Sequence, residues 1–263
     1  MAVLVLLLRR SRWFPGAEAL VAEARAEMPQ KNDLCGAFAA LVSVRAYGIP
    51  VLDQDEAAVA AGVRLAADPA AGLPPGEKGR DDYRVALPRA GEAAEAGASA
   101  GGVARAVEIL SSGRLKAVPA SGDWKVPGLH RLLQGCHELP WVALVANVDT
   151  GEFGAHDTPE RALTDYLEGG LPPMWNSRWH TGHFVLLAGT LHGPGGTLVS
   201  VVDTYPGLGD RGVHFQPLGR LAEALRRERL STPGGLLLVV READEPAAAE
   251  LVTAAGLSVA YWP

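Results

Sequence analysis

The pattern of apolar and polar residues predicts helices mainly in the first half of the chain and strands mainly in the second half. A stretch from Leu34 to Ala46 is apolar on nearly all sides, which is typical of a helix enclosed within a protein. Further helices are expected at 17–27, 53–61, 99–113, 127–133, 158–169, 218–227 and 246–255. Strands are expected at 2–8, 115–119, 141–147, 182–191, 197–203, 236–240 and 257–261. Because helices and strands are segregated rather than alternating, the pattern favours an α+β fold over a parallel-sheet fold.

The enclosed helix has clear signals at both ends. Asn32 or Asp33 can serve as its N-cap, and Gly48 followed by Pro50 marks its end. Cys35 then falls in the first turn, where free backbone N–H groups and the positive end of the helix dipole stabilise a thiolate. Gly36 beside it permits close approach of a substrate backbone. The alternative interpretation is that Cys35 is simply a small buried apolar residue.

A β-hairpin in the second half carries the other candidate catalytic residues. Its strands are expected at 182–191 and 197–203, joined by a turn at 192–196. His183 begins the first strand and Asp203 ends the second, so antiparallel pairing brings them within reach of each other, directly or diagonally. A carboxylate beside an imidazole orients the ring and stabilises its charged form. The alternative is a histidine that merely lies near a turn aspartate.

Two segments without clear periodicity are expected to be insertions in a single domain spanning residues 1–263. Residues 66–100 are rich in Ala, Gly, Pro and Glu, which predicts a loop-rich, partly mobile surface. Residues 150–181 end directly before His183, so an insertion there would lie beside the active site. Its Trp175, Trp179 and His180 are therefore candidate substrate contacts, since loops on a rigid scaffold often carry specificity.

Composition narrows the function classes further. The net charge of −6 argues against a nucleic-acid or anionic-membrane partner. Cys35 and Cys136 are too few for a disulfide framework and are expected to be free thiols.

The first Arg pair follows the initial apolar run, and no run approaches the ~20 residues of a membrane span, so a cytoplasmic protein is expected. No metal or cofactor is expected, because the H-x-x-H of His180 and His183 lacks the Glu of zincin chemistry. Four further histidines are expected to be surface or loop residues: His130, His156, His192 and His214.

Three separated motifs occur in the chain order of papain-like cysteine peptidases. They are L-C-G-A-F-A-A-L at 34–41, G-H-F-V-L-L at 182–187 and V-V-D-T-Y-P at 201–206. In this order they most closely resemble the bacterial double-glycine, or bacteriocin-processing, peptidases, over roughly residues 30–65, 100–120 and 138–206. The resemblance implies a papain-like fold, in which the helix carrying Cys35 packs on an antiparallel sheet carrying His183 and Asp203.

The same resemblance implies an oxyanion hole and a reaction. The family places a Gln before the Cys; Gln30 is one position closer than that spacing, so Asn32 is a second candidate, and Leu34 replaces the usual Asp. The implied activity is that of a thiol-dependent peptidase or amidase acting on a peptide-like substrate through an acyl-enzyme. Two alternatives remain open. One is transfer of the acyl group to an amine, as in ligases and transglutaminase-like proteins, which the G-I-P after the helix also resembles. The other is a catalytically inactive papain-like binding module.

Overall fold

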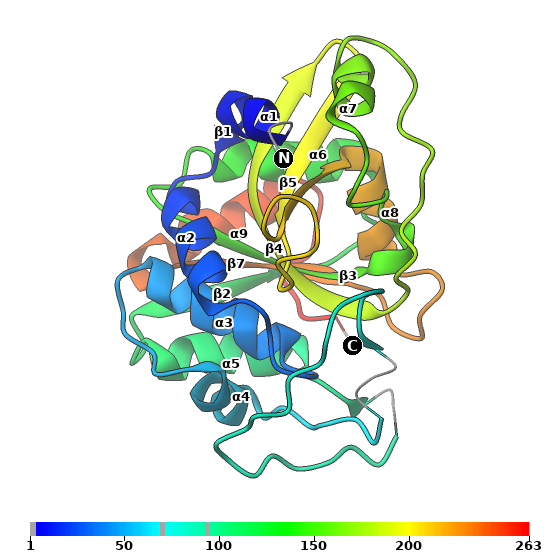
Figure 1. Ribbon diagram of the computed structural model, residues 1–263. Coiled ribbons are helices and arrows are strands. Elements are labelled where there is room, and N and C mark those ends of the chain that lie inside the picture. The colour runs from blue at the N-terminus through cyan, green and yellow to red at the C-terminus, as the bar shows by residue number, and fades with distance from the viewer. Residues whose placement is uncertain (1–3, 69–71, 93–94, 263) are drawn as a thin grey trace.

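The computed structural model describes residues 4–68, 72–92 and 95–262, and it has an α+β architecture built on one antiparallel sheet (Figure 1). The strand order is β2-β7-β3-β4-β5-β6, and β1 pairs with β4 off this path. The strands are β1 (Arg12–Trp13), β2 (Leu115–Ala120), β3 (Ala143–Asp149), β4 (Gly182–Gly193), β5 (Gly196–Val202), β6 (Val213–Pro217) and β7 (Gly235–Arg241). The α+β prediction is thereby confirmed.

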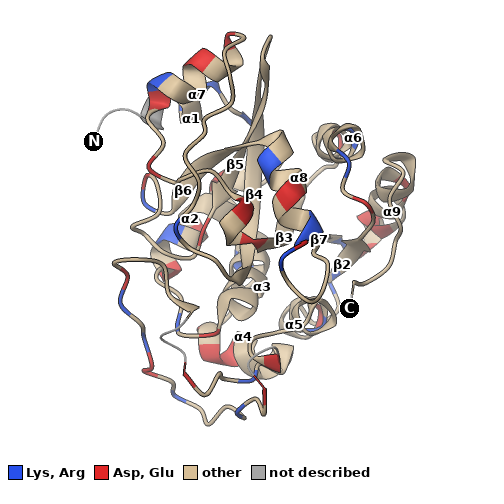
Figure 2. Cartoon of the chain, turned by 90° about the vertical axis from the view of Figure 1, so that its right-hand side faces the viewer, with Lys and Arg blue, Asp and Glu red and all other residues tan. Residues whose placement is uncertain are grey.

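Two groups of helices cover the sheet. One group comprises α2 (Ala17–Glu27), α3 (Cys35–Ala46), α4 (Gln54–Ala61) and α5 (Ala100–Leu110). In this group α2 and α3 contact β4, α5 contacts β2, and α4 packs outside on α3 and α5. The other group comprises α6 (Val126–Cys136), α8 (Leu218–Arg226) and α9 (Glu245–Ala254), of which α8 contacts β3 and β5 and α9 contacts β2. Two short helices complete the chain, α1 (Leu4–Arg10) and α7 (Glu160–Leu167). Figure 2 shows that most charged residues lie on helices and loops rather than on strands.

Helix α3 is enclosed by the protein, as its sequence predicts. Ten of its twelve residues are buried, all but Cys35 and Arg45. Each fully buried Leu or Phe on such a helix contributes about 1.5–3 kcal/mol relative to an exposed one. The predicted cap is wrong, however. The helix begins at Cys35 with Leu34 as a cap that makes no side-chain hydrogen bond, and Asp33 instead accepts a hydrogen bond from the Ala66 N–H.

The hairpin is formed by β4 and β5, with a tighter turn than predicted. Gly193 pairs with Gly196, and a bulge follows between Leu187 and Gly189. Near the other end Leu186 lies opposite Val202. In this register His183 and Asp203 are diagonal neighbours and not a directly opposed pair. His183 is paired with Val148 of β3 instead. The expectation that the two residues lie at neighbouring strand ends therefore holds, with a register shifted by the bulge and the shorter turn.

Two predicted strands and one predicted cap are wrong. Residues 2–3 of the strand expected at 2–8 lie outside the described residues, and from Leu4 onward the run belongs to α1, because an apolar run of this length without alternation fits a helix as well as a strand. Residues 257–261 form no strand, and only Ser258 bridges to Ser121. Thr158 does not cap α7, since its hydroxyl donates to the Ala155 carbonyl. Strand β6 is absent from the sequence-based expectations, because it is only five residues long and ends in Pro217.

The region predicted to be loop-rich is a loop. Among its described residues from 66 to 99 there is no α-helix and no named strand. Isolated bridges tie its two ends to the residues before it, Arg64 to Gly97 and Leu65 to Arg89.

Candidate active site

The fold brings the three sequence-predicted catalytic residues together. Asp203 directly follows β5, His183 is the second residue of β4, and Cys35 is the first residue of α3. The distance from His183 Nε2 to Asp203 Oδ1 is 3.1 Å, and both side chains are almost completely buried. Because Nε2 faces Asp203, Nδ1 is the ring nitrogen left for the thiol. Cys35 lies close enough for hydrogen bonding and charge interaction with His183 to raise the pKa of the imidazole.

The electrostatics of this trio favour a charged imidazole. Burial acts to lower the pKa of His183, but the Asp203 carboxylate and the Cys35 thiol outweigh it and raise that pKa to about 9. Burial likewise acts to raise the pKa of Asp203. The charge of His183 and the hydrogen bonds from His183 and His214 outweigh it and hold the pKa of Asp203 well below its usual range. At neutral pH the pair is therefore an imidazolium next to a carboxylate.

Asp203 is held by two further groups. Its Oδ1 accepts a hydrogen bond from the Thr204 N–H at 2.7 Å, and its Oδ2 lies 3.5 Å from His214 Nε2. Gln216, also on β6, fixes the orientation of His214. The Gln216 amide accepts from the Gly154 N–H and donates to the Gly154 carbonyl, so its Nε2 is a donor toward His214 Nδ1 at 3.1 Å. His214 Nδ1 is thus an acceptor, which leaves Nε2–H to donate to Asp203.

The expectation that His214 is a surface or loop residue is wrong. His214 is 3% exposed, because it lies on β6 with its side chain turned toward Asp203. A signal was present in V-H-F-Q-P at 213–217, where the polar residues His214 and Gln216 alternate with apolar ones. Such alternation predicts a strand whose two polar residues share one face.

Trp179 covers the imidazole, as expected of a residue just before His183. The two ring centroids lie 4.6 Å apart, and the indole N–H donates to the Gly72 carbonyl at 2.9 Å. Beyond Trp179 and Asp203 lies a cavity of about 470 Å³. Its walls include Trp175, His214 and the loop of residues 153–159. This volume is in the range of small-molecule sites.

The other predicted contact residues differ in their surroundings. Trp175 lines the cavity and is 55% exposed. His180 is exposed and packs over Gly151. Gly36 faces the interior, where an added Cβ would lie 2.9 Å from Val103 and 3.2 Å from Phe184. Close packing therefore explains this glycine without a ligand.

The two oxyanion-hole candidates are also distinguished. Asn32 is engaged in holding a loop, since its Oδ1 accepts from the Arg80 N–H and its carbonyl accepts from the Tyr83 hydroxyl. Gln30 is tied to the site through its N–H, which donates to the Thr204 carbonyl at 3.0 Å. Its side-chain Oε1 is buried and has no hydrogen-bond partner in the described part of the chain. Of the two amides, that of Gln30 is the one with no structural partner.

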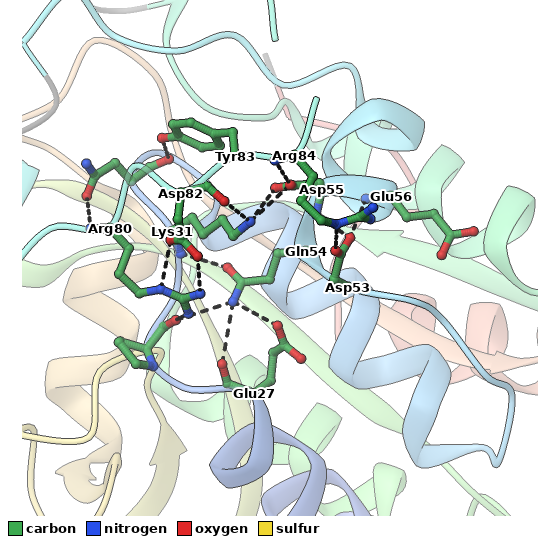
Figure 3. Close-up of polar contacts among 12 residues, drawn as sticks. Glu27, Lys31, Asp53, Gln54, Asp55, Glu56, Arg80, Asp82, Tyr83 and Arg84 are labelled. Carbon is green, nitrogen blue, oxygen red and sulfur yellow. Dashed lines mark hydrogen bonds and ion pairs between the residues drawn. The ribbon is translucent and has the colours of Figure 1, made fainter. Parts of the chain in front are cut away.

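A buried polar network anchors the segment that leads into Cys35 (Figure 3). Lys31 Nζ lies 3.0 Å from both carboxylate oxygens of Asp55 and donates to the Asp82 carbonyl at 2.7 Å. The Lys31 N–H donates to the Gln54 side chain. Residues 29–32, helix α4 and the loop at 80–84 are thereby joined around one buried ion pair. The network fixes the position of the chain four residues before Cys35.

Both cysteines are free, as predicted. They differ sharply in their environment, since Cys136 is completely buried and burial raises its pKa to about 12. Cys35 is only partly buried. Within the described residues there is no cluster of three metal-ligating side chains, and no helix long and apolar enough to cross a membrane.

The comparison with protein families covers this whole site. A family described as being of unknown function, DUF6885, matches residues 14–263. The chain belongs to DUF6885. The range matched by DUF6885 includes all the residues of the candidate site described above, from Gln30 to Gln216. No curated protein and no solved structure matches the chain.

The raised pKa of His183 predicts how stability depends on pH. The folded ring keeps its proton up to a pKa of about 9, whereas the unfolded ring releases it near 6.5. The resulting stabilisation is fully present below pH 6.5 and is lost as pH rises through 9, on the order of 3 kcal/mol in all. Urea unfolding at pH 6, 7.5 and 9 should show this loss in the wild type and not in His183→Gln. Parallel pH dependences for the two proteins would contradict the charged imidazole.

Proposed function

We propose that this protein is a thiol-dependent acyl-transfer hydrolase, a peptidase or amidase with Cys35 as nucleophile. The observation that carries the proposal is the position of His183, buried between a partly accessible cysteine and an ionised aspartate. A nucleophile next to a base, with the base oriented by a third group, is the arrangement that covalent catalysis requires. The papain-like resemblance of the three motifs supports the same assignment.

In the proposed reaction each group has one role. The Cys35 thiolate attacks the carbonyl carbon of an amide, and His183 in its charged form gives its proton to the departing amine. This leaves an acyl group on sulfur and a neutral imidazole. His183 then takes a proton from water as the water attacks the thioester, which releases the acid and restores the thiolate and the charged imidazole. Asp203 keeps the imidazole oriented throughout, and His214 and Gln216 hold Asp203 as positioning residues.

The oxyanion would be held at the start of α3. The first backbone N–H groups of a helix have no partner within the helix, and the Leu34 cap supplies no side-chain acceptor. The Cys35 N–H is therefore a donor suited to a developing negative charge. The Gln30 side chain, whose Oε1 has no hydrogen-bond partner among the described residues, is proposed to supply the second donor through its Nε2.

The test uses reagents that need no knowledge of the substrate. At pH 7 iodoacetamide is expected to label one thiol per chain, Cys35, faster than it labels glutathione. p-Nitrophenyl acetate is expected to give a burst of one nitrophenolate per chain. Cys35→Ala should abolish both signals. The matched control, Cys136→Ala, should retain both because Cys136 is buried and its pKa is raised.

The same experiment separates the alternatives. A thiol at Cys35 that reacts no faster than glutathione and gives no burst would contradict the proposal and favour an inactive binding module. If the burst is present, adding a primary amine distinguishes the acceptors. Formation of an N-acetyl amine in preference to acetate would indicate acyl transfer rather than hydrolysis.

A further inference from the structure

Arg227 lies beside the proposed nucleophile without belonging to the catalytic trio. It directly follows α8 and has a φ of 51°. A Cβ placed on Gly182 would lie 2.6 Å from Arg227 Nη2 and 3.5 Å from its Cζ. The guanidinium group therefore occupies the space above Gly182, the residue before His183.

Strand geometry puts this guanidinium on the side of the sheet where α3 begins. Alternate residues of a strand share a face, so Gly182 and Phe184 point the same way. Phe184 contacts α3 at Gly36, the residue after Cys35. Gly182 also directly precedes His183, which contacts Cys35, so Arg227 and Cys35 lie at the same end of β4. In agreement, burial lowers the pKa of Arg227 while the nearby Asp149 and Cys35 oppose that effect.

The side chain of Arg227 is unpaired within the part of the chain that the structure describes. Its neighbours in sequence are paired, Arg226 with Glu228 and Arg229 with Glu152. Among the described residues Arg227 makes no ion pair and no side-chain hydrogen bond, and its Nε is buried. The Asp149 carboxylate accepts a hydrogen bond from the Gly151 N–H and does not form an ion pair with Arg227. A half-buried guanidinium without a partner is costly unless a ligand satisfies it.

We propose that Arg227 binds a carboxylate of the substrate while the scissile carbonyl lies against Cys35. This inference rests on the proposed function and narrows it to peptide-like substrates that carry a carboxylate near the bond that is cleaved. A planar guanidinium can hold both oxygens of a carboxylate, which gives geometric selectivity as well as attraction. The unpaired Arg227 would also discriminate against the neutral amide of the same molecule, since that would leave the guanidinium unsatisfied.

The test compares two alkylating reagents that differ in the proposed group. Iodoacetate carries a carboxylate and iodoacetamide a neutral amide, so the ratio of their rates at Cys35, divided by the ratio for glutathione, reports carboxylate binding. We expect this ratio to fall at least tenfold in Arg227→Gln and to fall less in Arg227→Lys, which keeps the charge but not the planar fork. Arg226→Gln is the matched control and should leave it unchanged. Arg227 has a positive φ of 51°, and Lys or Gln at this position would adopt that backbone conformation with the same strain as Arg.

The outcomes separate this inference from the function on which it rests. A ratio within twofold of the wild type in Arg227→Gln, with Cys35 still reactive, would overturn the role of Arg227 alone. Slow labelling of Cys35 by both reagents would overturn the proposed function, and this role with it. Equal unfolding midpoints of the variants in urea would show that their folds are intact.

The source of the carboxylate is distinguished by protection of Cys35 against iodoacetamide. N-Acetylalanine offers a terminal carboxylate, N-acetylglutamic acid α-amide offers a side-chain carboxylate, and N-acetylalaninamide offers none. Protection by either acid that is lost in Arg227→Gln supports the proposal and identifies the source. Equal protection by all three compounds would overturn it.

Discussion

His183→Gln is expected to lower the rate of the p-nitrophenyl acetate burst by about 10²–10⁴-fold, the range for loss of a general acid–base group. Gln keeps a hydrogen-bonding side chain of similar reach but cannot carry the positive charge that accompanies a thiolate. The rate should be measured by stopped flow at pH 7 against the wild type.

His137→Gln is the control for this substitution. His137 bonds to Thr190 in the far half of β4, and burial lowers its pKa to about 4, so it shares neither the partner nor the charge of His183. Its burst should match that of the wild type. A burst in His183→Gln within threefold of the wild type would remove His183 from the reaction.

Lys31→Met is expected to destabilise the protein by about 3–5 kcal/mol, the range for removing one partner of a buried ion pair. The side chains of Lys31 and Asp55 are 6% and 0% exposed, so the variant leaves a buried carboxylate without its cation. The loss should appear as a lower midpoint of urea unfolding. Because Lys31 also donates to the Asp82 carbonyl, the loop at 80–84 should become more susceptible to proteolysis.

The matched control is an exposed ion pair of the same kind. Arg64 and Glu95 are 52% and 50% exposed, and Arg64→Met should change the free energy of unfolding by no more than about 1 kcal/mol. A further comparison replaces both buried partners. Lys31→Met with Asp55→Leu should be more stable than Lys31→Met alone, because no buried charge is left. Equal losses for the exposed and buried lysine or arginine variants would contradict the role of the network.

Much of the candidate site could be predicted because local signals mark it. Gly48 ends the apolar helix of Cys35 at the expected place, and the hairpin follows from two apolar strands around a Gly-rich turn. Those two elements were enough to expect His183 beside Asp203. The precise register was not predictable, since it depends on a bulge between Leu187 and Gly189 that no local signal locates.

Three residues of the site that were not among its sequence-based candidates are positioned by contacts with distant parts of the chain: His214, Gln216 and Arg227. His214 is placed beside Asp203 by the pairing of β5 with β6, and Gln216 acts through Gly154, far from it in sequence. Arg227 lies near Cys35 because α8 ends beside Gly182, the first residue of β4. Helix propensity and strand period carry no information about such contacts. The strand assigned to the first residues failed for a related reason, since a short apolar run fits either structure.

The strand order has a consequence for the newly synthesised chain. Strand β7 lies between β2 and β3 and pairs with both, although it is the last strand in sequence. Until residues 235–241 have left the ribosome, β2 has no partner among the described strands, and β3 is open on the side away from β4, the strand that carries His183. We therefore expect the proposed pair of Cys35 and His183 to form only when synthesis is nearly complete, so that Cys35 of a nascent chain lacks its activating partner.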